Sequence, residues 1–343
     1  MATRTAVIGA GAMGKGHLRS LASVPSAEVV ALVDPNEETL ASVAAENGVP
    51  STYTDVASML AAEQPEYAIV ASPVLYHAEQ SIAAFEAGAH VLCEKPLSMN
   101  MVEAEAIVEA ARRAQRLFTM GFQLRQSRAY RALKEFIDEG RLGEVYHARV
   151  WAGHIMAYPW GRYHHRKEYS FGGVMAATVV HILDAALWVL GSPEPVAVSA
   201  STFRRLDRIP DPPIDFKGTP DDVTVEDFGH AHVRFADGSS MSIEGNWLMH
   251  PCGHSTGFEI HGVLGLARDN GAGVELERKK EIVEEKLVQE EEPADRTAAE
   301  HGEFIAAIEG NGEPMVRFKQ ALGVQRILVG IYESAQAGAE VKV

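Results

Sequence analysis

The sequence predicts an α/β protein of two domains, a doubly wound parallel sheet followed by an α/β domain with a large, mainly antiparallel open sheet. Three observations indicate this. A glycine-rich turn at residues 9–14 joins an apolar run to a helical stretch, and such runs and helical stretches then alternate as far as residue 123. Beyond residue 143, strand patterns follow one another with few helices between them. We therefore place the domains at residues 1–123 and 124–343.

The glycine-rich turn has the pattern expected of a dinucleotide-binding site. The apolar run Thr5 to Ile8 leads into Gly9-Ala10-Gly11-Ala12-Met13-Gly14, and a helical stretch follows. Gly9 permits a tight turn, Gly11 lets the backbone approach a pyrophosphate, and Gly14 lets the helix pack against the strand. Anions are favoured at the helix N-terminus, next to Ala12 and Met13. This pattern predicts a Rossmann domain that binds a nicotinamide dinucleotide.

An acidic residue stands where such a domain recognises the ribose. The apolar run Val29 to Val33 ends in Asp34, twenty residues after Gly14. A carboxylate there hydrogen-bonds the ribose 2′-hydroxyl and repels a 2′-phosphate, and no Arg or Lys adjoins it. The expected cofactor is NAD rather than NADP. Alternatively, Asp34 caps the helix expected from Glu37.

The alternation continues through the first 123 residues. Strands are expected at 51–53, 67–71, 90–93 and 118–120, and helices at 39–46, 56–62, 78–87 and 101–115. Gly88 suits the end of the third of these helices. Ser72 and Pro73 follow one strand directly, on the edge where open α/β sheets bind ligands. His77 either contacts the cofactor or caps a helix, and the sequence leaves both interpretations open.

Glu94-Lys95-Pro96 follows the strand His90 to Cys93 at the same edge. Pro96 restricts its own φ and that of the residue before it, so a stiff backbone directs Lys95. A lysine held there can donate hydrogen bonds to a substrate oxygen, and its pKa can move if it is desolvated. The alternative is a surface lysine in a loop.

The second half is predicted to form a sheet of mostly consecutive strands. Strands are expected at 144–152, 194–203, 229–235, 239–246 and 258–261, and closing helices at 300–309 and 318–338. Asp237-Gly238 favours a hairpin turn between the third and fourth of these strands. Residues 204–220 are expected to form a long loop, and 279–293 a solvated strand or loop. The exposed face of the sheet would bury against another subunit, giving a homo-oligomer, either a dimer or a tetramer.

Composition narrows the functional classes. The 343 residues are 46% hydrophobic and 23% charged, with a net charge of −16, which argues against nucleic-acid binding. Residues 1–4 carry no leader pattern, and no apolar run is expected to approach the ~18 residues of a membrane span. The two cysteines, Cys93 and Cys252, fit a reducing compartment. We expect a cytoplasmic protein that does not bind membranes.

One segment, His250-Pro-Cys252-Gly-His254, carries three potential metal ligands within five residues. Pro251 and Gly253 suggest a turn, and no second cluster supplies the remaining ligands of a closed site. We therefore expect no metal.

Taken together, the motifs resemble those of the Gfo/Idh/MocA oxidoreductases, named after glucose–fructose oxidoreductase and inositol dehydrogenase. The resemblance spans nearly the whole chain and implies a Rossmann domain followed by an open-sheet domain. It implies NAD-linked oxidation or reduction of a hydroxyl compound. The motifs that carry it are Gly9–Gly14, Asp34, Ser72-Pro73-x-x-x-His77, Ala87-Gly88-x-His90-Val91-x-Cys93-Glu94-Lys95-Pro96-Leu97, Gly121-Phe122-Gln123-x-Arg125, Gly140–Gly143, Gly172-Gly173 through His181-Ile182-Leu183-Asp184, Val225–Phe228 and Phe235–Gly238.

The resemblance implies that Lys95 and His181 act on the reacting hydroxyl, His181 as the proton acceptor and Lys95 as a cation beside the developing alkoxide. Asp184, one helical turn after His181, either orients that ring, contacts substrate, or forms a structural ion pair. The other expected cofactor contacts are Glu94 and Gln123, and the other expected substrate contacts are Trp160, Arg162, Tyr163, His165 and Thr178.

The chain departs from the family at one position. Many members read Asp-x-Gly-x-His-x-x-Asp, whereas this chain has Ala177 and Val179 in place of the first aspartate and the glycine. Losing that counter-charge would tend to lower the pKa of Lys95. The expected activity is NAD-dependent oxidation, or formation, of a secondary hydroxyl of a sugar, cyclitol, glycoside or related polyol. The alternatives are a glycosidase or lyase that recycles bound NAD through transient sugar oxidation, and a non-catalytic NAD-binding protein.

Overall fold

The computed structural model describes residues 2–153, 163–208, 222–248, 256–269, 274–278, 281–283 and 292–343, which form two compact units. The first unit comprises Met1–Gln123 and Ala294–Leu322, and the second comprises Leu124–Pro293 and Gly323–Val343. The division after Gln123 lies where the sequence predicts it. Residues Ala294–Leu322, which we predicted in the second domain, instead return to the first unit.

The first unit contains a parallel sheet in the order β3-β2-β1-β4-β5-β6. The direction of strand addition reverses between β1 and β4, which is where doubly wound sheets bind their ligands. The predicted Rossmann sheet is therefore confirmed. Its strands are β1 (Thr3–Ile8), β2 (Ala27–Val33), β3 (Ser51–Tyr53), β4 (Tyr67–Val70), β5 (His90–Cys93) and β6 (Phe118–Met120).

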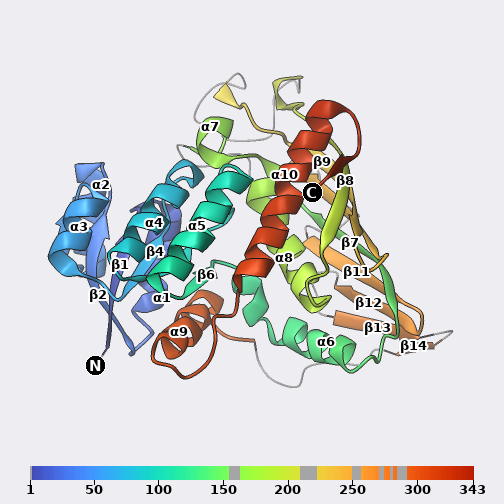
Figure 1. The fold of residues 1–343 in the computed structure, drawn as a ribbon, viewed down its shortest axis with the longest axis horizontal. Helices are drawn as coiled ribbons and strands as arrows, with labels where there is room; N and C mark the ends of the chain where they lie inside the picture. The colour runs from blue at the N-terminus through green and yellow to red at the C-terminus, as the bar shows by residue number, and fades with distance from the viewer. Residues whose placement is uncertain are drawn as a thin grey trace. The chain divides into compact units, whose positions relative to one another are not determined.

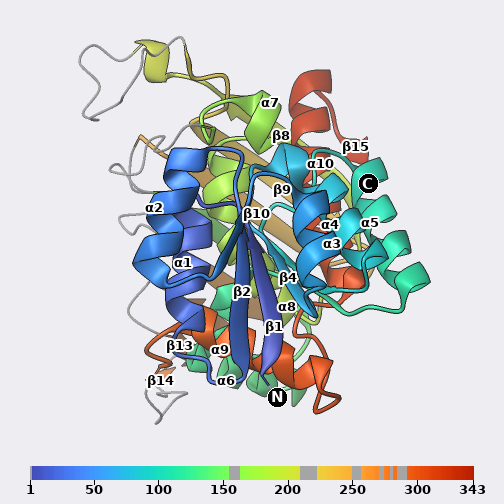
Figure 2. The ribbon, with the colours of Figure 1, turned by 90° about the vertical axis from the view of Figure 1, so that its left-hand side faces the viewer.

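Helices cover both faces of this sheet. Figure 2 shows α1 and α2 on one side of the strands and α3, α4 and α5 on the other. Three of the helices begin at a residue whose side chain accepts a backbone N–H, namely Asn36, Asp55 and Asn100. Gly88, at φ +91°, follows the end of α4 as predicted. The helices are α1 (Ala12–Leu21), α2 (Glu37–Asn47), α3 (Val56–Glu63), α4 (His77–Glu86) and α5 (Met101–Ala114), with a short 3₁₀ turn at Val74–Tyr76.

The returning segment adds α9 (Arg296–Ile308) beside α1. Phe304 and Ile305 of α9 belong to the same buried cluster as Val7 and Leu32 of the sheet. A helix with an apolar face must bury it, but its sequence does not say against which core. This is why the domain prediction missed the return.

The second unit contains a nine-stranded sheet, within the described residues, in the order β14-β13-β12-β11-β7-β10-β9-β8-β15. Among the strand pairs of the described residues, only β7–β10 is parallel, so the prediction of a mainly antiparallel sheet is confirmed. The strands are β7 (Val145–Ala152), β8 (Pro195–Phe203), β9 (Phe228–Phe235), β10 (Ser240–Asn246), β11 (Thr256–Gly262), β12 (Gly265–Asp269), β13 (Val274–Arg278), β14 (Glu281–Val283) and β15 (Val341–Lys342).

The predicted hairpin joins β9 to β10. The Phe235 N–H donates to the Ser239 carbonyl at 3.0 Å, and Gly238 takes a φ of +88°. In Figure 1, α6, α8 and α10 lie on one side of this sheet. The helical segments are α6 (Arg128–Asp138), α7 (Lys167–Ser170), a π-helix (Met175–Val179), α8 (Val180–Val189) and α10 (Phe318–Ala337), whose first residues lie in the first unit, with 3₁₀ turns at Gln123–Gln126 and Leu206–Arg208.

One helical stretch of the described residues, Lys167–Val189, is long and apolar enough to span a membrane, with a mean hydropathy of 1.6. The expectation that no run approaches this length was therefore wrong. However, 78% of its most apolar window is buried within the structure, and core helices of globular proteins pass the same test.

Candidate active site

The glycine-rich turn has the geometry that its sequence predicts. Gly9 has a φ of +106°, and a Cβ placed on it would lie 2.7 Å from the Ala71 carbonyl oxygen. A Cβ on Gly14 would collide with the carbonyl oxygen of Gly9. A Cβ on Gly11, by contrast, would meet no atom within 4 Å. Gly9 and Gly14 are thus required by close packing, while the backbone at Gly11 is open for the approach of a ligand.

The start of α1 is suited to bind a diphosphate. Gly11 is the N-cap of α1 and supplies no side chain to the first N–H groups. Asp34 lies at the end of β2, where its carboxylate accepts the Ala10 N–H at 2.9 Å and the Asn36 N–H at 2.9 Å. Because Asn36 itself caps α2, the alternative that Asp34 is the cap was wrong. These residues fit NAD, which the glycine turn and Asp34 would hold.

Lys95 lies just past the end of β5, beside a buried carboxyl group. Its backbone N–H donates to Glu94 Oε2 at 3.2 Å, and the Lys95–Pro96 peptide bond is cis. Burial lowers the pKa of Lys95, and the charge of Glu94 opposes this shift. The aspartate that the family motif places at Ala177 is therefore not the only possible counter-charge, since Glu94 supplies one within the first unit.

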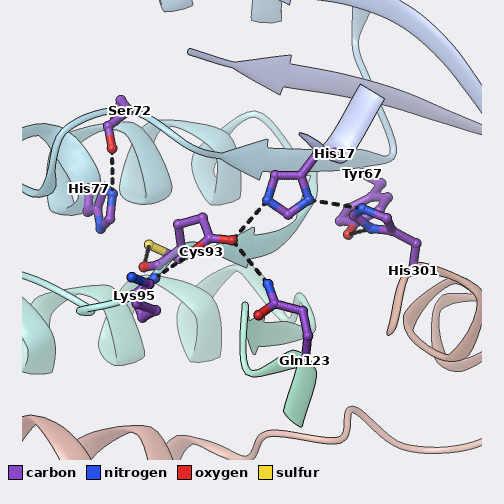
Figure 3. Close-up of polar contacts among 9 residues, drawn as sticks. His17, Tyr67, Ser72, His77, Cys93, Lys95, Gln123 and His301 are labelled. Carbon is purple, nitrogen blue, oxygen red and sulfur yellow. Dashed lines mark hydrogen bonds and ion pairs between the residues drawn. The ribbon is translucent and has the colours of Figure 1, made fainter. Parts of the chain in front are cut away.

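His77 connects the two loops at this edge of the sheet. Its Nε2 lies 2.9 Å from the Ser72 carbonyl oxygen (Figure 3). Its Nδ1 lies 2.9 Å from the Pro96 carbonyl oxygen. Burial lowers the pKa of His77, against the effect of these carbonyls. The Ser72 hydroxyl bonds Gln80 Oε1 at 2.6 Å. His77 therefore holds the Ser72-Pro73 turn against the Lys95 loop.

Glu94 binds two further side chains, one of which the sequence did not single out. Figure 3 shows His17 and Gln123 directed toward the same carboxyl group. His17 Nε2 lies 2.9 Å and Gln123 Nε2 3.4 Å from Glu94 Oε1. A Cβ on Gly121 would lie 2.5 Å from that oxygen, so only glycine leaves room for it. The only signal for His17 was a polar ring on the face of α1 that carries Gly14.

In the second unit, His181 is the second residue of α8, which follows a π-helical turn. Ala177, Thr178 and His181 are partly exposed although the segment around them is buried, so the three share one face. The Thr178 hydroxyl accepts the Trp247 indole N–H at 2.8 Å. π-Helical turns often occur at functional sites, and no sequence signal predicted this one.

Glu226 anchors the start of this helical segment. Its carboxylate accepts the Gly173 N–H at 2.8 Å, the Met175 N–H at 3.0 Å and the Tyr332 hydroxyl at 2.8 Å. Burial raises the pKa of Glu226, and these donors oppose the shift. Glu226 was part of a family motif but had no predicted role, and the structure shows that it fixes the helix that carries His181.

Asp184 forms the ion pair that was one of its three expected roles. Arg125 donates from Nε to Oδ2 at 2.8 Å and from Nη2 to Oδ1 at 2.7 Å, and neither side chain is more than 1% exposed. Burial raises the pKa of Asp184, and Arg125 opposes the shift. The partner lies in the second unit rather than in the Rossmann domain. Because the Asp184 side chain has no exposed surface in this structure, we do not propose it as a substrate contact.

This buried pair carries a prediction for stability. Arg125→Met would leave the Asp184 carboxylate buried without its bidentate donor, so the free energy of unfolding is expected to fall by about 3–5 kcal/mol. Urea unfolding measures it. Arg113→Met, which breaks the exposed pair with Glu86, should change it by less than about 1 kcal/mol. A fall for Arg125→Met no larger than that of the control would contradict this role.

The predicted substrate loop is only partly described. Tyr163 packs its ring on Tyr169, with centroids 4.9 Å apart. His165 is buried, and its carbonyl accepts the Thr224 N–H at 2.9 Å. Trp160 and Arg162 lie outside the described residues, as does the whole segment 250–254 with its three potential metal ligands.

Comparisons with known proteins agree with this site. Residues 3–122 match an oxidoreductase family described as having an NAD-binding Rossmann fold, and residues 130–268 match the GFO/IDH/MocA C-terminal domain. The D-glucoside 3-dehydrogenase of Escherichia coli (strain K12) is 27% identical over 99% of this chain and 97% of its own length. An inositol 2-dehydrogenase of Pseudomonas savastanoi pv. phaseolicola is 33% identical over 66% and 68%, respectively. A levoglucosan dehydrogenase solved with NADH and L-sorbose is 25% identical, with a TM-score of 0.85 over 100% of this chain and 99% of that one.

A Rossmann sheet with a diphosphate-binding turn, followed by an open-sheet domain, defines an NAD-dependent oxidoreductase. The chain belongs to the Gfo/Idh/MocA family. It is therefore an enzyme, an NAD-dependent dehydrogenase acting on CH–OH groups, as the motifs predicted.

Proposed function

We propose that the chain oxidises, or in reverse forms, a secondary hydroxyl of a sugar, cyclitol or related polyol. The observation that carries this is Lys95, a cation held at the ligand-binding edge of an NAD-binding sheet, with a lowered pKa and a buried carboxyl group beside it. Relatives named for D-glucoside and inositol substrates support the substrate class.

Two residues of the protein have separate roles in the proposed reaction. NAD, when bound, supplies the acceptor for the hydride that leaves the carbinol carbon. His181 takes the hydroxyl proton, since a neutral imidazole is a competent base near pH 7. The Lys95 ammonium stabilises the developing alkoxide by charge-assisted hydrogen bonding. That both act on one hydroxyl follows from the family motifs, since Lys95 and His181 belong to different units.

The remaining predicted contacts complete the proposal. Thr178 shares the partly exposed face of His181 and would contact substrate hydroxyls, as would residues of the loop 160–165.

The outer face of β9 carries polar, at least partly exposed side chains such as His230, His232 and Arg234. We propose this face of the sheet as the interface of a homo-oligomer in the cytoplasm, which light scattering of the full chain would detect.

The test is a panel of inositols, sugars and glycosides, each supplied with NAD and with NADP and followed at the nicotinamide absorbance band. We expect at least one member with NAD-dependent turnover well above the others. Turnover of none, with purified protein that binds NADH, would contradict the proposed substrate class.

Cofactor choice gives a separate prediction. Asp34→Ser removes the carboxylate expected to bond the ribose 2′-hydroxyl, so kcat/KM for NAD should fall roughly 10–100-fold. The same change should raise kcat/KM for NADP, because the repulsion of a 2′-phosphate is removed. Glu38→Ser, an acidic residue in the first turn of α2 with no predicted ribose contact, is the control. A wild-type protein that strongly prefers NADP would overturn the role of Asp34.

A further inference from the structure

Four buried polar side chains form a continuous chain behind Lys95 (Figure 3). Tyr67 Oη lies 2.8 Å from His301 Nδ1, His301 Nε2 lies 3.0 Å from His17 Nδ1, and His17 Nε2 lies 2.9 Å from Glu94 Oε1. Tyr67, His17 and His301 have no exposed surface, and Glu94 is 3% exposed. None of the three residues behind Glu94 has a role in the proposed reaction.

The members of this chain come from distant parts of the sequence. Tyr67 begins β4, His17 lies on α1, and Glu94 follows β5. His301 lies on α9, in the segment Ala294–Leu322 that returns to the first unit. The hydrogen-bond chain therefore links α9 to the loop of Lys95 through polar contacts between buried side chains. Buried polar groups are retained when their hydrogen bonds are satisfied.

The hydrogen-bonding capacity of each group fixes the positions of the protons. Among the described residues, the Tyr67 hydroxyl bonds only to His301, so its proton must go to His301 Nδ1. His301 is neutral, because burial holds its pKa well below the ordinary value. Its proton is then on Nε2 and is donated to His17 Nδ1. His17 in turn donates from Nε2 to Glu94, which accepts as a carboxylate.

Two other protonation states reverse the direction of these hydrogen bonds. A proton on Glu94 Oε1, or a second proton on His17, would make His301 donate from Nδ1 to the Tyr67 oxygen. The Tyr67 proton would then have no acceptor among the described residues, and an unsatisfied buried donor is unfavourable. The direction of the hydrogen bonds therefore favours an unprotonated Oε1, and the Lys95 N–H that Oε2 accepts favours a carboxylate at the other oxygen.

Glu94 transmits this arrangement to Lys95. Its second oxygen accepts the Lys95 backbone N–H at 3.2 Å, and its charge acts on the Lys95 ammonium. We propose that Tyr67, His301 and His17 are positioning residues. They form a directed hydrogen-bond chain that fixes the position and the negative charge of Glu94, and Glu94 in turn fixes the Lys95 backbone and stabilises the Lys95 ammonium. The proposal rests on the proposed function in that Lys95 is taken as the catalytic cation.

Other titratable groups lie close enough to the hydrogen-bond chain to affect the charges of its members. Asp295, the N-cap of α9, interacts with His17, and Glu300 interacts with Tyr67. On the side of the Lys95 loop, His77 interacts with Glu94. The negative charge of Asp295 favours a positive charge on His17, so the neutral arrangement depends on the hydrogen bonds and can be tested directly.

The first test needs neither substrate nor turnover. Long-range ¹H–¹⁵N correlation spectra of the full chain with ring-labelled histidine distinguish the neutral tautomers from the imidazolium form. At pH 7, we expect His17 and His301 to be neutral with slowly exchanging protons on Nε2, each assigned by its loss in His17→Phe or His301→Phe. Tyr67→Phe should release His301 into a mixture of tautomers. A proton on Nδ1, or an imidazolium, in either ring of the wild type would overturn the proposal.

The second test asks whether the chain acts through Glu94. His17→Phe should lower kcat roughly 10–100-fold while the NADH dissociation constant stays within about threefold, since a charge-assisted hydrogen bond is lost. In a Glu94→Gln background, the same change should cost less than about twofold more. The proposal would be overturned if the losses in kcat from His17→Phe and Glu94→Gln multiply in the double variant. It would also be overturned if His17→Phe keeps the wild-type kcat.

Controls separate these effects from misfolding. His90, at the other end of β5, accepts the Leu117 N–H at 2.9 Å and lies outside the chain, so His90→Phe should change neither kcat nor the two ring signals. If His17→Phe does not fold, His301→Phe serves in its place, because it removes the partner of His17 Nδ1 and leaves His17 beside Glu94. Its kcat should then fall in the same direction as expected for His17→Phe, and a wild-type value would count against the proposed hydrogen-bond chain.

The outcomes for the two proposals are distinct. If Lys95→Ala abolishes turnover while His17→Phe leaves it intact, only the positioning chain is wrong. If Lys95→Ala retains full turnover, the proposed role of Lys95 fails, whatever the tautomers show. If no compound is turned over, the ring spectra alone decide whether the directed chain exists.

Discussion

Replacing Lys95 with alanine is expected to lower kcat by about 10²–10³-fold, while the NADH dissociation constant changes by less than about threefold. The physical reason is that the ammonium meets the alkoxide only as charge develops, in a site whose burial already lowers the Lys95 pKa. Steady-state kinetics and NADH fluorescence titration measure the two quantities. Lys134→Ala, which removes a surface partner of Asp138, should leave both unchanged.

The pH dependence of kcat gives a second prediction about the role of Lys95. Stabilising an alkoxide requires the ammonium form, so kcat should fall as pH rises through the pKa of Lys95, which burial places below the ordinary lysine value. Glu94→Gln removes the negative charge that opposes this shift. The fall in kcat should therefore move to lower pH in Glu94→Gln, and movement to higher pH would contradict the assignment.

Replacing His181 with alanine is expected to lower kcat about 10²–10⁴-fold, the usual contribution of a general base, with NADH binding intact. His181 lies at the start of α8, which Glu226 anchors through the Gly173 and Met175 N–H groups, so its backbone should not move when the ring is removed. His90→Ala serves as a control for the loss of a histidine. Full turnover in His181→Ala would show that another group takes the hydroxyl proton.

The first unit was predictable because its signals are local. Gly9, Gly14 and Asp34 act within a single βαβ unit, and the structure shows why each residue type is needed there. The hairpin at Gly238 was predictable for the same reason. Short motifs carry their own backbone requirements, so one chain is enough to recognise them.

The parts that were missed depend on long-range pairing. The return of α9 to the first unit, and with it the contact of His301 with His17, joins residues 284 positions apart in the sequence. The parallel pairing of β7 with β10 likewise has no signature in either strand. Asp184 was ambiguous because its spacing from His181 says nothing about Arg125, which supplies both of its hydrogen bonds.

The central claim is that this chain releases one reduced cofactor for each hydroxyl that it oxidises. The most direct measurement follows NADH formation and the oxidised product together, on the best compound of the panel, with NAD in excess. A dehydrogenase predicts NADH and ketone product in a one-to-one ratio throughout the reaction. Product that accumulates without NADH, as in a glycosidase or lyase that recycles its cofactor, would contradict the claim.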